Sequence, residues 1–510
     1  MNDRVISEPR LIRDILSELD LGNSVAEQDA ALERYFVETE TFRVLVEGKK
    51  DIIAGDKGTG KTALYRILQQ RHDVLPELKN VQLISGFNPD GNPVFQRLAE
   101  GEPMDEGQYI TVWKAYILSL VGNSILSAWE DAPTESMFEL AELLERVGLK
   151  SADSTPNAIF NQVVNLFRRL MNPISAEMAI SVGPTGMPVI APRVTFADPS
   201  AVREPVIVEH DTALALLNKV LQEIDTTVWL ALDRLDEAFA GFLAAEIPAL
   251  RALLRSYLDL NAYERIKLKL FVRKDLFRRI IAGGFVNLTH INASKVEIVW
   301  DDPDLFDLLY RRIAESEDFV ASLSLAGSSA DEAFASVFPE KVDPGKRKPR
   351  TWPWMLSRIR DGNDIKPPRN LIDLVLKSQE AQARAEARNP REYVIGAAII
   401  SSDSIKRGLQ ALSNERVQDT LLAEAGDYAP VIERFRNGKA EHNADSLASL
   451  GNSLDEIKVL REIGFLEALG DTLKVPMLYR DGLNITQGKA FEDDEIGGAE
   501  GSDDDAADED

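Results

Sequence analysis

Short runs of hydrophobic residues alternate with longer amphipathic segments through the first 300 residues. Five of these runs have the length and composition of buried parallel strands: 52–54, 81–87, 228–232, 266–272 and 294–300. Between them, apolar residues recur at helical spacing, as in the segments 110–126 and 211–224. Strands separated by helices favour an α/β fold with a five-stranded parallel sheet and right-handed crossovers. Ligands of such sheets bind at the carboxyl ends of the strands.

Two segments depart from this alternation. Residues 1–50 carry an irregular stripe of apolar residues, which we interpret as N-terminal helices that cover an edge of the sheet. Residues 175–195 alternate apolar and polar side chains and are cut by glycine and proline, a pattern that predicts a β-hairpin. We therefore expect a P-loop core at 51–305 that contains a helical and β-hairpin insertion at about 100–212.

Beyond residue 305 the pattern becomes mostly helical, which predicts a helical lid at 306–390. A further module is expected at 395–488. It contains a helix at 454–463 and then two short strands joined by Gly470-Asp471, which is typical of a hairpin turn. A helix followed by such a hairpin indicates a winged helix. Because the acids of this helix outnumber its bases, we expect it to contact protein rather than DNA.

The first predicted strand leads into a phosphate-binding loop. The stretch GDKGTGKT is a complete G-x-x-x-x-G-K-[ST] motif, and average residue usage gives about 0.02 chance matches in a chain of this length. In such a loop, backbone N–H groups and a helix N-terminus surround the phosphates. Lys61 is expected to reach the β- and γ-phosphates, and Thr62 to ligate Mg²⁺. The predicted nucleotide-binding residues of the loop are Gly55, Asp56, Lys57, Gly58, Thr59, Gly60, Lys61 and Thr62.

The predicted strand 228–232 ends in Asp233, an acid that in this position holds Mg²⁺. Asp236 and Glu237 follow, and either carboxylate can orient and deprotonate the water that attacks the γ-phosphate. An apolar strand that ends in an aspartate is a weak signal by itself. It becomes informative here because a phosphate-binding loop precedes it in the chain.

Two arginines complete the candidate site. Arg273 follows the predicted strand 266–272, where a polar side chain can sense the γ-phosphate. The alternative for Arg273 is an ordinary ion pair with a nearby acid. Arg369 follows two prolines at the start of a predicted helix, from which it can reach back to the γ-phosphate.

Composition narrows the class of protein. With 510 residues, 44% hydrophobic and 28% charged, the chain has the make-up of a soluble globular protein of about two to four domains. No membrane helix and no secretory signal are expected. The sequence contains no cysteine, which excludes disulfides, thiolate catalysis and cysteine metal sites and agrees with a cytoplasmic location.

Charge is distributed unevenly along the chain. The net charge is −26. We expect a disordered acidic tail at 489–510, because its residues 492–510 include eleven acids and no base. A basic cluster is interleaved with Trp352 and Trp354, and its bases are Lys341, Lys346, Arg347, Lys348, Arg350, Arg358 and Arg360. Such a cluster can bind nucleic acid, but the Trp-Pro-Trp run favours core packing, so nucleic acid is a possible partner that we do not favour.

Four segments resemble those of stand-alone bacterial P-loop ATPases related to the STAND and KAP groups of the ASCE division: DIIAGDKGTGKTAL, VWLALDRLDEAF, LKLFVRKDLF and KPPRNLIDLVLKSQEA. The resemblance spans about residues 21–383. It implies phosphate and Mg²⁺ binding by Lys61 and Thr62, and a Walker B role for Asp233. It also implies that Arg273 is a sensor and that Arg369 is a lid arginine.

One position departs from that pattern. Many ATPases of this division place the catalytic acid directly after the Walker B aspartate, and this chain has Arg234 there. Asp236 or Glu237 can substitute for it, and we expect hydrolysis to be slow.

The resemblance implies a nucleotide-driven switch with a helical lid and a winged-helix region, and several relatives act in bacterial defence against phage beside a separate effector. We therefore expect an ATP-binding, Mg²⁺-dependent ATPase that forms a homo-oligomer and controls a separate effector protein. Two alternatives stay open. One is a motor or loader stimulated by nucleic acid, and the other is an oligomeric scaffold that nucleotide holds together with little hydrolysis.

Overall fold

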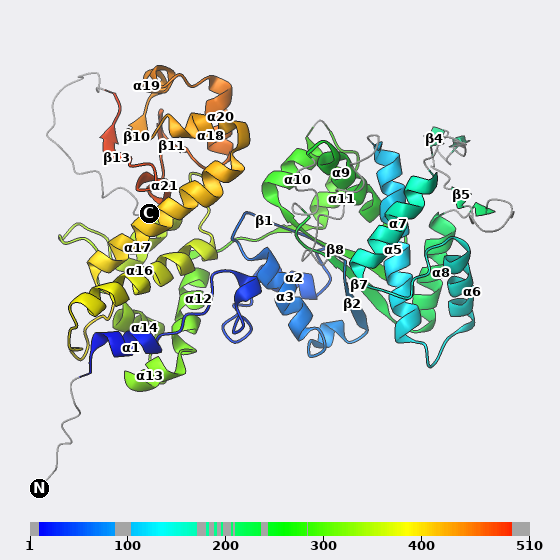
Figure 1. Cartoon of the computed structure of the whole chain (residues 1–510), viewed down its shortest axis with the longest axis horizontal. Coiled ribbons are helices and arrows are strands. Elements are labelled where there is room, and N and C mark those ends of the chain that lie inside the picture. The colour runs from blue at the N-terminus through cyan, green and yellow to red at the C-terminus, as the bar shows by residue number, and fades with distance from the viewer. Residues whose placement is uncertain are drawn as a thin grey trace, which may run out of the picture. The chain divides into compact units, whose positions relative to one another are not determined.

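The structure is a computed structural model that describes residues 10–86, 104–170, 180–182, 188–190, 195–196, 206–207, 210–235, 243–282 and 284–491. Contacts divide the chain into two compact units (Figure 1). Unit 1 contains Gly58–Gly60 and the described residues of Met1–Val37 and Trp300–Asp510, and unit 2 contains those of Glu38–Lys57 and Lys61–Val299. The predicted disorder of the acidic tail at 492–510 falls outside the described residues.

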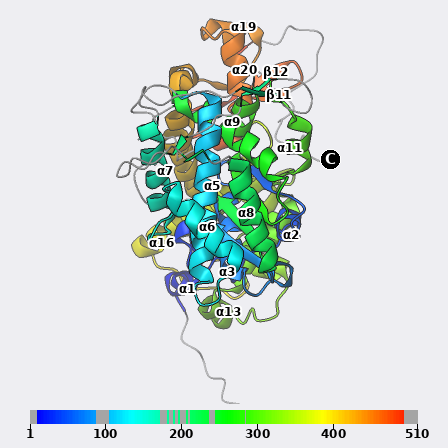
Figure 2. The same ribbon diagram turned by 90° about the vertical axis from the view of Figure 1, so that its right-hand side faces the viewer.

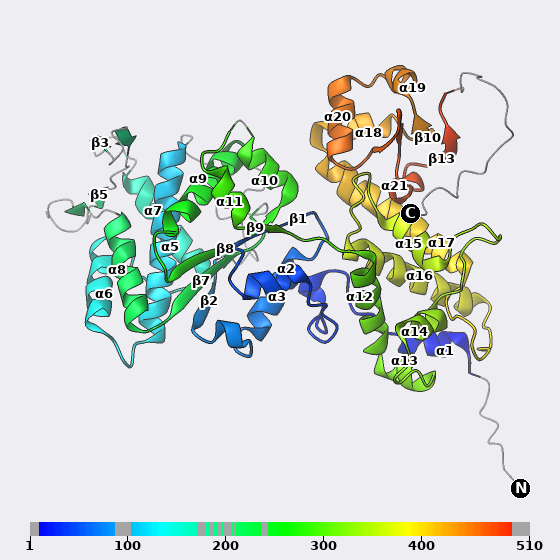
Figure 3. The same ribbon diagram turned by 180° about the vertical axis from the view of Figure 1, so that it is seen from behind.

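Unit 2 is built on the predicted sheet. Its strands are β1 (Ile52–Gly55), β2 (Val81–Ser85), β7 (Thr227–Leu232), β8 (Ile266–Arg273) and β9 (Lys295–Glu297). They lie in the order β2-β7-β8-β1-β9, and every neighbouring pair is parallel, which confirms the five-stranded parallel sheet (Figure 3). Because β8 lies between β1 and β7, the carboxyl ends of the three strands that precede the predicted site residues are adjacent. Strand β9 is shorter than the predicted run 294–300 because it is an edge strand that pairs only with the short β1.

Helices cover both faces of this sheet. The helices of unit 2 are α2 (Glu40–Val46), α3 (Lys61–Arg71), α5 (Glu106–Ala128), α6 (Glu135–Arg146), α7 (Pro156–Leu170), α8 (His210–Glu223), α9 (Leu243–Leu260), α10 (Lys274–Ile281) and α11 (Leu288–Ala293). Side chains alternate across β7, and Val228, Leu230 and Leu232 enter the core formed with α5 and α9. On the opposite face, the ring of Tyr65 of α3 packs edge-on against the ring of Phe271, with the ring centres 5.5 Å apart.

Helix α5 is the core helix of unit 2. In the part of the chain that the structure describes, it is the single helix whose length and hydropathy match those of a membrane span. Most of its side chains are buried, and it contacts α6, α7, α8 and α9 (Figure 2). Its N-terminus is fixed by a capping box, in which Asp105 accepts a hydrogen bond from the backbone of Gln108 at 2.8 Å. A helix surrounded on all sides by protein is apolar all round for that reason.

The predicted insertion contains short antiparallel strand pairs, and the N-terminal segment contains a helix. The hairpin predicted at 175–195 is present as β3 (Ile180–Val182) and β4 (Pro188–Ile190), which pair antiparallel. A second antiparallel pair joins β5 (Thr195–Phe196) to β6 (Val206–Ile207). The N-terminal helix α1 (Ile12–Glu18) buries its apolar residues in the core of unit 1, and its predicted cover of the sheet edge stays a prediction.

The first part of unit 1 after Trp300 is helical, as predicted beyond residue 305. It contains α12 (Asp302–Ala314), α13 (Glu317–Ser322), α14 (Ala330–Val337), α15 (Thr351–Ile359), α16 (Pro368–Arg388) and α17 (Ser402–Glu415), which continues as a π-helix (Arg416–Leu422). Helices α16 and α17 pack so closely that a Cβ atom on Gly408 would lie 2.7 Å from the backbone nitrogen of Ser378. Only glycine allows this approach.

The last part of unit 1 is the predicted winged helix. It contains α18 (Ala429–Glu433), β10 (Lys439–His442), α19 (Ala444–Ser449), α20 (Leu454–Glu462), β11 (Glu467–Leu469), β12 (Thr472–Lys474), α21 (Met477–Arg480) and β13 (Thr486–Lys489). The strand order is β11-β12-β10-β13, and the hairpin of β11 and β12 is the wing. Gly470 turns the hairpin with a φ of +57°, a left-handed conformation that favours glycine.

A buried ion pair attaches the N-terminal segment to α12 within unit 1. Arg312 is 3% exposed and Asp29 is 2% exposed, and a guanidinium nitrogen lies 3.1 Å from the carboxylate. The Arg312 guanidinium also lies 4.2 Å from the centre of the Tyr35 ring, and it donates to the carbonyl of Leu21. Tyr35 hydrogen-bonds Asp29, and burial raises the pKa of the Tyr35 hydroxyl well above its usual range.

Candidate functional site

The phosphate loop follows β1 directly and ends where α3 begins, which confirms the predicted order of strand, loop and helix. Gly58 has a φ of +79° and Gly60 a φ of +99°. Both values lie in the left-handed region, where a side chain strains the backbone, so the motif needs glycine at these positions. This conformation turns successive backbone N–H groups toward one side of the loop, which is the geometry of an anion-binding nest.

Lys61, the first residue of α3, folds back over the loop. Its Nζ donates to the carbonyl oxygen of Gly55 at 2.8 Å and to that of Asp56 at 2.9 Å. The ammonium group is therefore held at the mouth of the loop by two backbone acceptors. A phosphate oxygen would be a stronger partner for the ammonium than these neutral carbonyls, because it carries a negative charge.

Asp233 lies directly after β7 and next to the start of α3. It is 7% exposed and accepts hydrogen bonds from the Thr62 hydroxyl and from the backbone N–H of Arg234. Burial raises the pKa of Asp233 to about 6, although those hydrogen bonds and the charge of Lys61 lower it. The structure thus places the two predicted Mg²⁺ residues, Thr62 and Asp233, in contact with each other.

Asp233 makes the stability of the protein depend on pH. Its carboxyl group has an ordinary pKa of 3.8 and a pKa of about 6 in the folded chain, so the folded state keeps a proton that the unfolded state loses. In the absence of Mg²⁺, the free energy of unfolding is therefore expected to fall by about 3 kcal/mol between about pH 4 and pH 7. Asp233→Asn should remove this part of the pH dependence. Chemical denaturation of both proteins across this range, with a chelator present, measures the difference, and identical profiles would contradict the prediction.

The predicted water-activating acids cannot be located. Asp236 and Glu237 both lie outside the described residues, which end at Leu235 and resume at Leu243. Arg234, between Asp233 and this segment, has a φ of +54°. A left-handed conformation at a residue with a long side chain is uncommon and is found most often at functional sites.

Arg273 ends β8 and pairs with the acid two positions later. Its Nε and one terminal nitrogen each lie 3.0 Å from a carboxylate oxygen of Asp275, a bidentate arrangement. Burial raises the pKa of Asp275, but the charge and hydrogen bonds of Arg273 outweigh it and hold the pKa below its usual range. The structure thus contains the ion pair that is the alternative to a sensor, and the sensor role of Arg273 stays a prediction.

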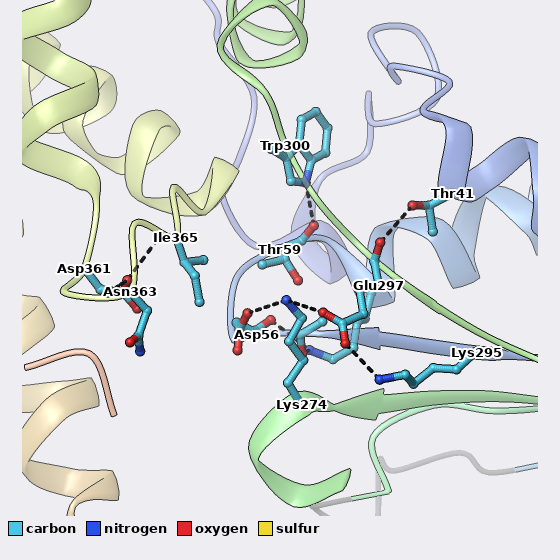
Figure 4. A network of polar contacts seen from close by, with 12 residues as sticks. Thr41, Asp56, Thr59, Lys274, Lys295, Glu297, Trp300, Asp361, Asn363 and Ile365 are labelled. Carbon is cyan, nitrogen blue, oxygen red and sulfur yellow. Dashed lines mark hydrogen bonds and ion pairs between the residues drawn. The ribbon is translucent and has the colours of Figure 1, made fainter. Parts of the chain in front are cut away.

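The next residue, Lys274, contacts the phosphate loop, and sequence reasoning missed it. Its Nζ lies 3.3 Å from a carboxylate oxygen of Asp56 and 3.0 Å from one of Glu297, at the end of β9 (Figure 4). Lys295 pairs with the other Glu297 oxygen at 2.8 Å. The only local signal was a basic pair, Arg273-Lys274, at the end of a strand. Nothing in the sequence distinguished which of the two faces the loop.

The tip of the phosphate loop makes its contacts within unit 1. The indole nitrogen of Trp300 donates to the carbonyl oxygen of Thr59 at 2.9 Å (Figure 4). The backbone N–H of Arg369, at the start of α16, donates to the carbonyl oxygen of Gly58 at 3.4 Å. A Cβ atom on Gly58 would lie 3.1 Å from the Cβ of Arg369, so glycine is needed here for the close approach as well. Trp300 is a second residue that sequence reasoning missed, because it was assigned to the end of a strand.

These residues fit a nucleotide with Mg²⁺. The Nε of Arg369 is a buried donor for which the described residues supply no hydrogen-bond acceptor, as expected beside an anionic ligand. No cluster of three or more histidine, aspartate or glutamate side chains with metal-binding geometry occurs in the described part of the chain. Thr62 and Asp233 would therefore supply only part of a Mg²⁺ coordination shell, and Mg²⁺ sites commonly take their other ligands from phosphate and water.

The tryptophans of the basic cluster, the candidate for nucleic-acid binding, make their contacts within unit 1. Trp354 is 2% exposed, and its indole nitrogen donates to Asp343 at 2.8 Å. Trp352 packs edge-on against Phe306 with ring centres 5.0 Å apart. The Arg358 guanidinium lies over the Trp354 ring at 4.1 Å. The two indoles therefore pack into the core and are not arranged as stacking platforms for bases.

No protein-family model and no curated protein sequence matches the chain. Among solved structures, a Walker-type ATPase of Pyrococcus abyssi has a TM-score of 0.41 and 13% identity over 92% of this chain and 100% of that chain. The ORC2 protein of Aeropyrum pernix, with ADPNP and ADP, has a TM-score of 0.32 and 16% identity over 90% and 92%. The ORC1 protein of the same organism, with DNA, has a TM-score of 0.33 and 14% identity over 91% and 96%. At this level of similarity, what the chain binds and does has to be argued from its own residues.

Proposed function

We propose that the chain is an ATP-binding P-loop ATPase that acts as a nucleotide-driven switch with slow hydrolysis. The observation that carries this proposal is the environment of the phosphate loop. Lys61 rests on loop carbonyls at 2.8 and 2.9 Å, and the backbone of Arg369 lies against Gly58 at 3.4 Å. We infer that Lys61 binds the phosphates and that Arg369, at the start of α16, responds to the nucleotide that is bound.

The chain's own residues have distinct parts in this proposal. Lys61 exchanges its backbone acceptors for phosphate oxygens, and the loop N–H groups bind the remaining charge. Thr62 and Asp233 hold Mg²⁺, which when bound neutralises charge on the β- and γ-phosphates. Asp236 or Glu237 takes the proton of the attacking water.

Slow hydrolysis is proposed because of the residue next to Asp233. In place of a carboxylate, that position holds Arg234, in a left-handed conformation with a φ of +54°. A guanidinium group has no acceptor, so it cannot take a proton from water. In this proposal the acid that activates water is therefore Asp236 or Glu237, two or three positions after Arg234. A longer-lived ATP state suits a switch better than a motor.

Within unit 1, hydrogen bonds join the loop that precedes Arg369 in the chain to the winged helix. The loop 361–365, of which Figure 4 shows Asp361, Asn363 and Ile365, leads into α16. Hydrogen bonds join this loop to the end of α20 and to Gly464. The Gly362 N–H donates to the Gly464 carbonyl at 2.7 Å, and the Asn363 side chain donates to the Glu462 carbonyl at 3.2 Å. We propose that the nucleotide state at Arg369 is transmitted through this loop to the winged helix, which then acts on a partner.

Arg369→Ala tests the switch. We expect the variant to keep ATP binding within about tenfold of the wild type, because Lys61 and the loop still bind the phosphates. It should lose the difference between its ATP and ADP states. Hydrogen exchange of the loop 361–365 and sedimentation with ATP, ADP and no nucleotide measure that difference. Arg384→Ala is the matched control, since Arg384 lies on the same helix and pairs only with Glu380 on its exposed side.

The same measurements separate the switch from its rivals. Equal assembly with ATP and ADP, but none without nucleotide, would indicate a scaffold that nucleotide holds together. ATP hydrolysis that rises on addition of DNA or RNA, and falls steeply with salt, would indicate a motor or loader. If wild-type exchange and sedimentation do not change with nucleotide, the switch proposal is wrong.

We further propose that the switch forms a homo-oligomer in the cytoplasm and controls a separate effector in defence against phage. This part rests on the resemblance to STAND and KAP ATPases, together with the composition of α20, in which the acids Asp455, Glu456 and Glu462 outnumber the bases Lys458 and Arg461. An acidic helix beside a wing is suited to a basic protein surface rather than to DNA. Sedimentation of the chain with its candidate effector, with and without ATP, tests the partnership.

A further inference from the structure

The phosphate loop carries a carboxylate of its own, which is an obstacle to binding a polyanion. Asp56 is the second residue of GDKGTGKT, directly after β1. A negative charge on the loop repels the phosphates that the loop N–H groups attract. Binding of nucleotide is easier if a cation neutralises this carboxylate in the folded chain.

Lys274 is placed to do this within unit 2. Its ammonium lies 3.3 Å from Asp56 and 3.0 Å from Glu297, and its side chain is 15% exposed (Figure 4). The three residues come from three elements: the loop after β1, the start of α10 and the end of β9. Lys295 extends the chain of alternating charges, since it pairs with Glu297 but not with Asp56. Glu297 thereby holds the lysine in position from the side opposite the loop.

The position of Lys274 in its helix shows that the carboxylates, and not the helix, stabilise its charge. It is the first residue of α10, where the helix dipole disfavours a cation. Burial also lowers its pKa, yet its hydrogen bond to Glu297 and the charges of Asp56 and Glu297 outweigh burial and raise the pKa above its usual value. The hydrogen bond from Lys295, together with the hydrogen bond and charge of Lys274, holds the pKa of Glu297 below its usual range.

We propose that Lys274 is a positioning residue for nucleotide binding that neutralises the Asp56 carboxylate and holds the loop in its binding conformation. This rests on the proposed function, because it assigns a role in binding ATP to a residue beside the same loop. Lys274 acts through Asp56 and does not itself need to contact the nucleotide. Removing the cation should therefore weaken binding only as long as Asp56 keeps its charge.

A set of four variants tests this. Lys274→Met should weaken binding of a fluorescent ATP analogue with Mg²⁺ by about tenfold at low salt, and by less at high salt because ions screen the repulsion. Asp56→Asn should bind as well as the wild type or better. The double variant Lys274→Met with Asp56→Asn should recover the wild-type affinity. Lys295→Met, which leaves the contact with Asp56 in place, should bind within about twofold of the wild type.

The outcomes are distinguishable. Wild-type affinity in Lys274→Met would overturn the inference, and so would a double variant as weak as Lys274→Met, since the lysine would then act by shape and not by charge. Equal melting temperatures of the four variants exclude loss of fold as the cause of weaker binding. If the wild type itself binds no nucleotide, the proposed function fails and this inference fails with it, whereas a wild type that binds and a Lys274→Met that binds equally leave the proposed function intact.

Discussion

Lys61→Ala is expected to weaken ATP binding by at least about 30-fold and to abolish turnover, because truncating one partner of a desolvated charge pair typically costs about 2–5 kcal/mol. In the structure the Lys61 ammonium donates to the carbonyl oxygens of Gly55 and Asp56, at 2.8 and 2.9 Å. Phosphate oxygens replace these neutral partners with charged ones. Equilibrium binding of a fluorescent ATP analogue and release of phosphate measure the two effects.

The control for this variant is Lys79→Ala. Lys79 is an exposed lysine in unit 2 that follows the short 3-10 helix Pro76–Leu78, so its loss removes the same charge away from the loop. It should bind ATP as the wild type does. If Lys61→Ala and Lys79→Ala bind equally well, the phosphate-loop assignment is wrong, and the switch that depends on it fails too.

Arg312→Met is expected to lower the free energy of unfolding of unit 1 by about 3–5 kcal/mol, because it leaves the Asp29 carboxylate buried without its cation. Both residues are no more than 3% exposed, and the guanidinium carbon lies 4.2 Å from the centre of the Tyr35 ring. The variant therefore loses a charge pair, a cation–π contact and the hydrogen bond to the Leu21 carbonyl together. Denaturant unfolding monitored by tryptophan fluorescence measures the change.

The neighbouring arginine provides the comparison. Arg311→Met removes a side chain that is 44% exposed and pairs with Asp307 on the surface of the same helix, a pair worth about 1 kcal/mol or less. Adding Asp29→Asn to Arg312→Met should restore part of the lost stability, because no charge is then left buried. If Arg312→Met and Arg311→Met unfold at the same denaturant concentration, the prediction is wrong and the buried pair stabilises unit 1 no more than the surface pair does.

Local patterns were enough for the elements that surround the phosphate loop. The strand, the loop and the helix from Ile52 to Arg71 follow one another in the chain, and each is specified by nearby residues. Apolar runs placed β2, β7 and β8 in the same way. Strand β9 was overestimated, because hydrophobicity does not reveal that an edge strand ends where its only neighbour, β1, ends.

Side-chain partners of the candidate site were less predictable. The sequence contains Arg273 and Lys274 in succession, and we predicted a role for the arginine. In the structure Arg273 pairs with Asp275, and Lys274 contacts the loop at Asp56. Both cations follow the same strand, so the choice between them depends on which way each side chain leaves the backbone, and this is settled by the carboxylates of neighbouring elements.

The amino-acid sequence alone was enough to predict a phosphate-loop motif, a parallel sheet whose first strand leads into it, and a winged helix in the last part of unit 1, because glycine spacing and hydrophobic periodicity act over a few residues. Only the tertiary structure decided that α1 is buried in unit 1, that Arg312 pairs with Asp29 at a separation of 283 positions, and that Lys274 faces Asp56. Such contacts join segments far apart in sequence, and their energy depends on burial and on the exact distance between charges, neither of which exists until the chain has folded.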